Sequence, residues 1–332
     1  MAERNRRMVL AERPSGMVDE STVRLEEVDV PQPGDGEMLA RVRYVSIDPT
    51  IRTWMDDAPG YLPPIQIDEV VRSGGVAEVV SSNSDRFEPG QLLFGMTGWQ
   101  DYVVGADGYQ TLPPGVPPTL ALSLLGITGM TAYFGMTDVG RVQEGDVVVV
   151  SGAAGATGST AGQIAKIKGA KKVIGIAGGP QKCAYAVDEL GFDEMIDYKS
   201  ENVGARLREA APDGIDLYFD NVGGEILDAC LARLALRGRI VLCGAISGYN
   251  DRGAAKGPAN YANLIIKRGR MEGFLILDYF DRMPEAQQVV AGWLREGKIK
   301  SSEHVVEGLE NAPDALNLLF TGGNTGKVIV QL

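Results

Sequence analysis

Hydrophobic and polar positions alternate in two different ways along the 332 residues of the chain. Up to about residue 122, short runs rich in alternating apolar residues are separated by Gly, Pro, Asp and Ser, which is typical of strands joined by turns. The runs are EMLARVRYVSID, GGVAEVVSS, PGQLLFG and WQDYVV. This pattern predicts a twisted antiparallel β-barrel for the first part of the chain.

A second pattern begins near Leu124 and continues to Gly297. Six strand-like apolar runs occur there, and helix-like segments separate most of them. Strands that alternate with helices indicate a parallel sheet with helices on both faces, and six strands make a full dinucleotide-binding fold. The six runs are DVVVVSG, KKVIGIAG, EMIDY, IDLYFDNVGG, RIVLCGA and MEGFLIL.

The last segment, NAPDALNLLFTGGNTGKVIVQL, predicts a helix, a Gly-rich turn and a strand. We expect this tail to return to the first domain, so that the nucleotide domain is an insertion. The predicted organisation is a barrel domain over residues 1–123, a doubly wound α/β (Rossmann) domain over 124–297 and a return to the barrel over 298–332.

The turn after the first of the six strands is rich in glycine. Gly152, Gly155 and Gly158 follow one another at three-residue steps, and Gly162 lies on the next helix. This is not the strict G-x-G-x-x-G spacing, but a strand precedes it and a helix follows. Gly155 and Gly158 let the backbone approach a pyrophosphate at a positive helix end, and Gly162 lets the helix pack tightly. The alternative, an ordinary tight turn that binds no phosphate, is weakened by the strand–helix–strand context.

The end of the second strand indicates which nicotinamide cofactor is used. NAD sites usually carry an Asp or Glu there, whereas this chain continues with Gly178 and Gly179 and reaches Lys182 without a carboxylate. Lys182 would attract a 2′-phosphate as a point charge. The alternative is a solvated lysine, but a positive charge in a first helical turn opposes the helix dipole, which favours the functional interpretation. The predicted cofactor is NADPH/NADP.

Composition and charge exclude several classes of protein. The formal net charge of −12 repels a phosphate backbone, so nucleic-acid binding is not expected. The apolar runs are far shorter than the ~20 residues that span a membrane, and the start, MAERNRR, lacks the apolar core of a secretory signal. We therefore expect a cytoplasmic protein that binds no membrane.

Metal-ligating residues are few. Cys183, Cys230 and Cys243 are widely spaced and odd in number, which indicates reduced thiols, and His304 is the only histidine. Zinc chemistry is therefore not expected. His304 is interpreted as a strand or surface residue, and Cys243 as a small buried hydrophobe.

Seven stretches together are more specific than the glycine turn. They are SIDPTIRTWM, GITGMTAYFGM, GAAGATGSTAGQIAK, DELGFDEMIDYKSE, DLYFDNVGGEILD, GRIVLCGAISGYN and NTGKVIV. With them the chain resembles, over nearly its whole length, the zinc-independent medium-chain dehydrogenase/reductases. The branch is that of prostaglandin reductase (leukotriene B4 12-hydroxydehydrogenase), alkenal double-bond reductase and curcumin reductase. The resemblance implies a GroES-like barrel with a Rossmann domain, and NADPH-dependent reduction of the C=C bond of α,β-unsaturated aldehydes and ketones (an oxidoreductase acting on CH–CH). We expect a homodimer.

The resemblance also implies site residues. Met130 and Thr131 match a loop under the nicotinamide, Tyr198 lies near the adenosine, and Asn324 closes over the cofactor. The segment after the fifth strand and a strand around 274–277 border the nicotinamide half. The full expected set for NADPH is Met130, Thr131, Gly155, Ala156, Thr157, Gly158, Gly178, Lys182, Tyr198, Asn221, Cys243, Gly244, Ala245, Ile246, Ser247, Phe274, Leu275, Ile276 and Asn324.

The substrate side is less determined. Many relatives carry a tyrosine after S-x-D-P, where this chain has Thr50. The smaller residue predicts a more open pocket, so the substrates of those relatives cannot be assigned to this chain. Tyr61 is a second candidate for the substrate cleft, and the alternative is an exposed loop aromatic.

Hydride addition to the β-carbon of an enone leaves negative charge on the carbonyl oxygen, which needs hydrogen-bond donors and a proton for the α-carbon. Tyr249 follows the fifth strand, where the ligand crevice of a doubly wound sheet opens, and a phenol (reference pKa about 10) is protonated at neutral pH. We therefore predict Tyr249 to be catalytic and to contact the substrate. Packing on the cofactor is the alternative role, with the cofactor ribose hydroxyl or water as donor.

Two other functions stay open. A quinone oxidoreductase of the same superfamily shares the zinc-free fold, and a noncatalytic NADPH-binding protein would keep the cofactor site without the reaction.

Overall fold

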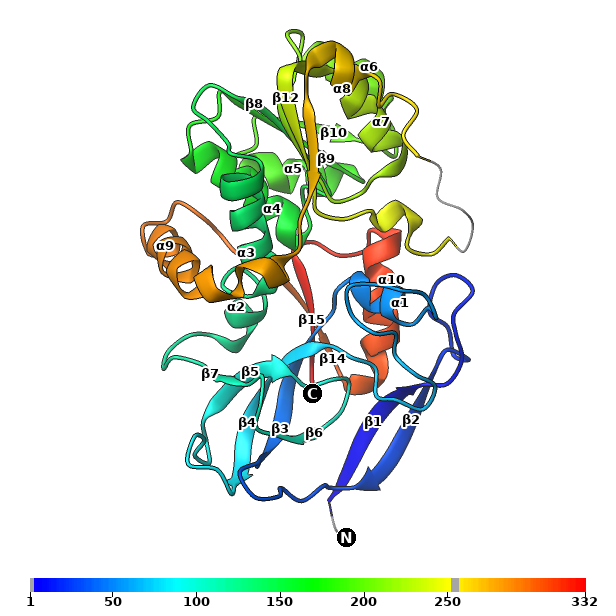
Figure 1. Cartoon of the computed structure of the whole chain (residues 1–332), viewed down its shortest axis with the longest axis vertical. Coiled ribbons are helices and arrows are strands. Elements are labelled where there is room, and N and C mark those ends of the chain that lie inside the picture. The colour runs from blue at the N-terminus through cyan, green and yellow to red at the C-terminus, as the bar shows by residue number, and fades with distance from the viewer. Residues whose placement is uncertain (1–2, 252–256) are drawn as a thin grey trace. The chain divides into compact units, whose positions relative to one another are not determined.

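The structure is a computed structural model that describes residues 3–251 and 257–332 (Figure 1). These residues divide into two compact units. Unit 1 contains residues 3–122, 249–251 and 303–332, and unit 2 contains residues 123–248 and 257–302. The domain limits predicted at 123/124 and 297/298 remain predictions.

Unit 2 is built on a six-stranded sheet in which all neighbouring strands are parallel. Its strands are β8 (Val147–Ser151), β9 (Lys172–Ala177), β10 (Glu194–Asp197), β11 (Ile215–Asp220), β12 (Leu234–Leu242) and β13 (Arg270–Gly273). The order across the sheet is β10-β9-β8-β11-β12-β13. From β8 the chain adds β9 and β10 on one side, and then returns to add β11, β12 and β13 on the other side. This is the doubly wound order, with its switch point between β8 and β11, and it confirms the predicted Rossmann fold.

Helices cover both faces of this sheet (Figure 1). The helices of unit 2 are α3 (Ile127–Phe134), α4 (Ala156–Ile167), α5 (Pro180–Asp188), α6 (Val203–Ala210), α7 (Gly224–Ala232), α8 (Asn263–Lys267) and α9 (Met283–Arg295), of which α9 packs on α3 and not on the sheet. The central strand β8 has a run of valines because a parallel strand is enclosed on both faces, and Val148, Val149 and Val150 are fully buried. Residues of α6, α7 and α8 pack on one face, where Val149 lies.

Gly162 on α4 has the close packing expected of it. A Cβ atom there would lie 2.0 Å from Cζ of Phe192, a buried residue just before β10. Any side chain would therefore push α4 away from its neighbours, and the first crossover of the sheet depends on this glycine.

Unit 1 contains a seven-stranded sheet with the order β14-β15-β3-β4-β5-β7, with β6 also paired to β3, and a separate β1-β2 pair. Its strands are β1 (Arg4–Leu10), β2 (Val23–Asp29), β3 (Met38–Ser46), β4 (Gly74–Ser82), β5 (Leu92–Met96), β6 (Tyr102–Gly105), β7 (Gln110–Thr111), β14 (Glu303–Glu307) and β15 (Lys327–Gln331). Its helices are α1 (Thr50–Trp54), α2 (Pro118–Leu122) and α10 (Ala312–Thr321). All pairings are antiparallel except β14–β15. The antiparallel prediction for the first part of the chain is confirmed.

Two local predictions are wrong. Strand β13 ends at Gly273, and a 3₁₀ helix (Ile276–Arg282) follows where a strand was expected around residues 274–277. Its Tyr279 stacks on Phe134 of α3 with ring centroids 4.5 Å apart, so the apolar run FLIL leads into an aromatic cluster. Met130 and Thr131 lie inside α3, not in a loop, because the segment Ile127–Phe134 forms two helical turns.

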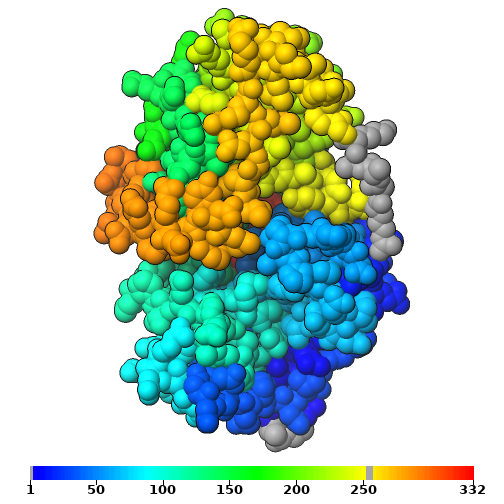
Figure 2. Space-filling view, viewed as in Figure 1, coloured from blue at the N-terminus to red at the C-terminus, as the bar shows by residue number. Residues whose placement is uncertain are grey.

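The segment that carries α8 and β13, gold to light orange in Figure 2, lies at the surface of unit 2. Tyr261, Ile265 and Ile266 are exposed there, and β13 is the edge strand of the sheet. The expected homodimer remains a prediction. In the described residues, we find no helix with both the length and the apolar character needed to cross a bilayer.

Candidate functional site

The glycine turn connects β8 to α4 through a tightly closed backbone. Gly152 has φ +61°, a left-handed conformation that glycine adopts without strain. A Cβ atom on Gly158 would lie 2.2 Å from the Gly152 carbonyl oxygen, so the first helical turn can contact this loop only with glycine there. Gly155 is the N-cap of α4 and provides no side-chain cap for the N–H groups behind it. The helix start can therefore receive an anion on its backbone donors.

The start of α5 lies after the neighbouring strand and carries a cation. Gly179 is its N-cap with φ +98°, Pro180 is the first helical residue, and Lys182 lies in the first turn. Lys182 is half-buried, and its pKa is lowered, first by burial and second by the positive charge of Lys199. The start of this helix is thus locally positive.

Lys199 is a residue that the sequence reasoning missed. It lies two residues beyond β10, in the turn after Asp197. A Cβ atom on Gly178 would lie 2.9 Å from Cε of Lys199 and 2.9 Å from Cε1 of Tyr198. Both side chains therefore cross the end of β9. In the sequence, the motif IDYK shows only that Lys199 follows Tyr198. That both lie beside the end of β9 depends on the pairing of β9 with β10 in the sheet.

The Asp197 carboxylate, on which the Lys199 charge acts, is engaged by backbone donors. Oδ1 of Asp197 accepts hydrogen bonds from the N–H groups of Gly179 (2.8 Å) and Lys199 (3.0 Å), and Oδ2 accepts one from the Ser200 hydroxyl (2.9 Å). These bonds, led by that from Gly179, lower the pKa of Asp197. Asp197 holds the turn after β10 against the start of α5.

Asp220 is the centre of a hydrogen-bond network, here called the Asp220 node, that the sequence did not reveal. It ends β11 at the point where the strand order reverses, and it is fully buried. Its Oδ1 accepts hydrogen bonds from the Tyr218 hydroxyl (2.6 Å), the N–H groups of Gly223 (2.8 Å) and Val222 (2.9 Å), and the Ser151 hydroxyl (3.2 Å). The side-chain amide of Asn221 donates to the Ser151 carbonyl (2.6 Å). The loops after β8 and β11 are thereby joined.

The loop after β12 is attached to the same node. The N–H groups of Cys243 and Gly244 donate to the Asp220 carbonyl (2.9 and 3.0 Å), and the Ser247 hydroxyl donates to the Val222 carbonyl (2.6 Å). Three strand ends that the sequence predicted to contact cofactor thus lie together. Burial, with the Asp220 charge adding to it, raises the pKa of the Cys243 thiol to about 12. The thiol stays protonated at neutral pH, but the side chain is half-buried, so the prediction of a buried residue is wrong for Cys243.

Other predicted residues lie elsewhere. Phe274 and Leu275 follow β13, and Ile276 begins the 3₁₀ helix. Met130 is fully buried, and the Thr131 hydroxyl donates to the Ile127 carbonyl within α3 (2.7 Å). Of the residues in unit 1, Tyr249 is half-buried in a turn, and Asn324 is buried with its amide donating to the Gly326 carbonyl (3.0 Å).

Tyr61 lies next to Thr50 within unit 1. The Tyr61 hydroxyl interacts with the side chains of Thr50 and Trp54, and its ring meets that of Trp54 edge-on at 6.3 Å. Tyr61 is 44% exposed in a loop, as the alternative of an exposed loop aromatic predicts. Partial burial still raises the pKa of Tyr61, and the nearby charge of Asp48 adds to the shift. A phenol is therefore present beside the position where relatives carry a tyrosine, although the sequence places it eleven residues later.

The segment before Thr50 is attached to the C-terminal strand. Lys327 is buried, and its Nζ donates to the Ile47 carbonyl (2.5 Å) and to Oδ1 of Asp48 (2.7 Å). Burial lowers the pKa of Lys327 and the Asp48 charge opposes this shift. A buried lysine left without a partner is strongly unfavourable, so the pair fixes residues 47–48 to β15.

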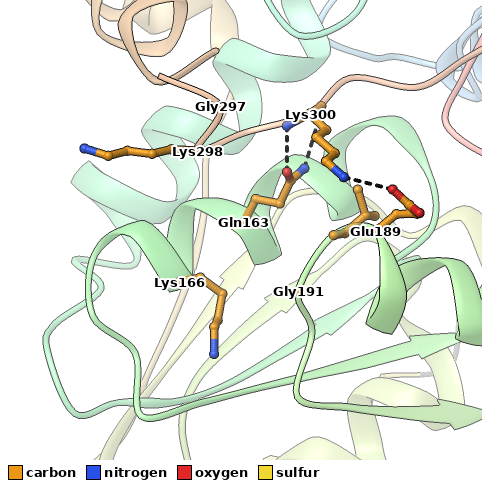
Figure 3. Close-up of a pocket in the computed structure, with 8 residues that line it drawn as sticks. Gln163, Lys166, Glu189, Gly191, Gly297, Lys298 and Lys300 are labelled. Atoms are coloured by element: carbon orange, nitrogen blue, oxygen red, sulfur yellow. Dashed lines mark hydrogen bonds and ion pairs between the residues drawn. The ribbon is translucent and has the colours of Figure 1, made fainter. Parts of the chain in front are cut away.

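A cavity of about 240 Å³ lies elsewhere in unit 2 (Figure 3). It is lined by Gln163, Lys166, Glu189, Leu190, Gly191, Gly297, Lys298 and Lys300. Its lysines are ion-paired, Lys166 with Asp193, Lys298 with Glu296 and Lys300 with Glu189. None of the predicted site residues lines it, so we place the candidate site at the strand ends.

Comparison with known proteins gives consistent matches. A family model described as the N-terminal domain of oxidoreductase matches residues 6–112, and one described as zinc-binding dehydrogenase matches residues 156–292. The chain is 42% identical to the NADPH-dependent curcumin reductase of Escherichia coli, over 99% of this chain and 97% of that protein. It is 39% identical to the NADP(+)-dependent 2-alkenal reductase of Nicotiana tabacum, over 99% and 97%. The crystal structure of CurA in complex with NADPH from Vibrio vulnificus superposes with a TM-score of 0.94, at 45% identity and 98% coverage of both chains.

One of these family descriptions mentions zinc, an ion that proteins bind through His, Cys and acidic side chains. Within residues 3–251 and 257–332, no group of three or more His, Cys, Asp or Glu side chains is placed to hold a metal ion. His304 lies on β14 opposite Val328, and the three cysteines are unpaired thiols. The residues present therefore do not fit a zinc site, whereas the glycine turn and the lysines fit a phosphorylated dinucleotide.

Proposed function

Because this chain belongs to the medium-chain dehydrogenase/reductase superfamily, in the branch of the curcumin, alkenal and prostaglandin reductases, we propose that it is an NADPH-dependent reductase of enals and enones. The reaction is the reduction of the C=C bond of an α,β-unsaturated aldehyde or ketone by hydride transfer to the β-carbon. The single observation that carries the cofactor assignment is the pair of helix starts after β8 and β9, one closed by glycine and one positive.

The chain's own residues divide the binding of NADPH among three strand ends. Backbone groups of residues 155–158 bind the pyrophosphate, and Lys182 binds the 2′-phosphate. Asn221 and residues 243–247 contact the nicotinamide half, held in place by the Asp220 node. Within the proposal, Tyr198 contacts the adenosine, Gly178 leaves room beside it, and Asn324 and residues 274–276 complete the site with Met130 and Thr131.

When bound, the reduced nicotinamide supplies the hydride. The protein must then stabilise the negative charge on the substrate carbonyl oxygen and deliver a proton to the α-carbon. We assign a hydrogen bond to that oxygen to the Tyr249 hydroxyl, and a place in the substrate cleft to Tyr61. Tyr61 places a phenol beside Thr50, which supports its assignment to the substrate side.

The wider proposal keeps the remaining expectations. Residues 1–123 and 298–332 form the substrate domain, residues 124–297 form the NADPH domain, and the enzyme acts as a cytoplasmic homodimer.

The test is turnover of 4-phenyl-3-buten-2-one with NADPH that carries deuterium at the transferable C4 position. We expect the saturated ketone, with deuterium on the β-carbon. An allylic alcohol, or deuterium on the carbonyl carbon, would refute C=C reduction. A quinone consumed at a higher kcat/KM than any enone in a panel would favour the quinone oxidoreductase. Tight NADPH binding with no oxidation by either class would favour the noncatalytic protein.

A further inference from the structure

Two lysines from different elements meet at the end of β9. Lys182 belongs to the first turn of α5, and Lys199 belongs to the turn after β10. The side chain of Lys199 passes over Gly178, because a Cβ atom on Gly178 would lie 2.9 Å from Cε of Lys199. The positive charge of Lys199 acts on Lys182 and, after burial, is the second cause that lowers the Lys182 pKa. The two like charges repel each other, and an anion bound between them would remove the repulsion.

The backbone around the pair is held in a fixed arrangement. Asp197 accepts the N–H groups of both Gly179 and Lys199 on one oxygen, at 2.8 and 3.0 Å. This clamp keeps residue 199 beside the start of α5. In the described part of the chain, Lys182 forms no ion pair with a carboxylate, so its charge is not neutralised within the protein.

The negative net charge of the whole chain increases the need for local cations to attract an anionic cofactor. The formal net charge is −12, so the field of the protein repels an anionic cofactor. A phosphate monoester carries a charge of about −1.5 to −2 at neutral pH, which one ammonium group cannot balance.

We propose that Lys199 is a second specificity-determining cation for the 2′-phosphate of NADPH, and that Lys182 and Lys199 together set the preference over NADH. This inference rests on the proposed NADPH-dependent function. It adds a residue outside the glycine turn and outside the set expected from the sequence.

The test uses binding of adenosine 2′,5′-bisphosphate and of adenosine 5′-monophosphate to the full-length protein, measured by calorimetry. The two ligands differ only in the 2′-phosphate, and neither can react. Lys199→Ala should weaken binding of the bisphosphate about tenfold and leave the monophosphate within about twofold. Lys199→Arg should restore most of the bisphosphate affinity because it restores the charge.

Lys171→Ala is the matched control. Lys171 is an exposed lysine that directly precedes β9, so its removal deletes one charge at the opposite end of the same strand. This substitution should leave the affinities for the bisphosphate and the monophosphate unchanged. A second readout needs no ligand: in Lys199→Ala, the pKa of the Lys182 ammonium, followed by NMR, should rise.

The outcomes separate this inference from the proposed function. If Lys182→Ala abolishes the preference for the bisphosphate while Lys199→Ala leaves both it and the Lys182 pKa unchanged, the role of Lys199 is refuted and the NADPH assignment stands. If the unmodified protein binds the two ligands equally, the NADPH assignment itself is refuted.

Discussion

The starts of α4 and α5 occupy equivalent places in the fold, each after a neighbouring parallel strand, but they offer an anion different groups. Both helices follow a parallel strand of one sheet, and both begin after a glycine that supplies no side-chain cap. At α4 the contacts available are backbone N–H groups, and glycine is required by a 2.2 Å approach. At α5 two lysine side chains converge on the helix start. Backbone donors recognise the pyrophosphate that all dinucleotides share, whereas the lysines recognise the phosphate that only NADPH carries.

The largest effect is expected when a side chain is introduced at the start of α4, because this start is assigned the pyrophosphate that NADPH and NADH share. Gly158→Val places atoms on the Gly152 carbonyl, so the turn must open and the helix start moves. We expect saturable binding of NADPH and NADH to be lost together, measured by fluorescence titration. Gly292→Val is the control, because Gly292 on α9 has open space around it. Loss of NADPH binding alone would contradict a common pyrophosphate site.

A catalytic residue should lie outside both cofactor regions. Tyr249→Phe removes only a hydroxyl, and we expect kcat for an enone to fall roughly ten- to a thousandfold, the usual effect of one such donor. The dissociation constant of NADPH should stay within about twofold. Tyr261→Phe, an exposed tyrosine of unit 2, is the control. Unchanged turnover in Tyr249→Phe would assign Tyr249 to packing and leave the ribose hydroxyl or water as the donor.

The α5 side of the comparison predicts a selective effect. Lys182→Ala removes a charge-assisted contact, for which about 1.5–3 kcal/mol is typical. KM for NADPH should rise by about one to two orders of magnitude, and KM for NADH should change little. Steady-state kinetics with both cofactors measures this. Equal changes for the two cofactors would exclude a 2′-phosphate role for Lys182.

The same lysine predicts a pH dependence. Burial and the Lys199 charge lower the Lys182 pKa, so Lys182 loses its proton at a lower pH than an exposed lysine. Bound phosphate favours the charged form, so NADPH affinity should fall as the pH rises through the lowered pKa, by about tenfold in total. NADH affinity should stay level over the same range. Dissociation constants from pH 7 to 10.5 measure both, and a parallel fall for NADH would point to another group.

The smallest expected effect is that of metal removal. The donor set in the described residues does not fit zinc, so dialysis against a strong chelator should leave the rate unchanged. Elemental analysis of the active protein checks the result independently. A stoichiometric metal whose removal abolishes activity would overturn the zinc-independent assignment.

The fold could be predicted because its signals are local. Alternating strands and helices gave the parallel sheet, and the glycine at 162 indicated the tight packing found on Phe192. The end of β13 could not be predicted, because an apolar run such as FLIL fits a strand as well as the segment that leads to Tyr279.

The candidate site was predictable only where it is contiguous in sequence. Residues 155–158 and Lys182 follow their strands directly. Lys199 and Asp220 depend on which strand ends are neighbours, so their roles required the sheet order. Tyr61 is a third case, since its hydroxyl reaches Thr50 only because the loop after α1 folds back.

The pairing of Lys327 with Asp48 has a consequence for biosynthesis. The two residues are 279 positions apart, and β15, which carries Lys327, lies between β14 and β3 in the unit 1 sheet. A ribosome releases Asp48 early and Lys327 among the last residues, so the N-terminal strands emerge without the strand that completes their sheet. Unit 2 is encoded almost continuously between them and can bury its core first. The N-terminal strands therefore stay without their β14–β15 neighbours until residues 303–332 have been made, and removal of these residues should cause aggregation rather than give a smaller folded protein.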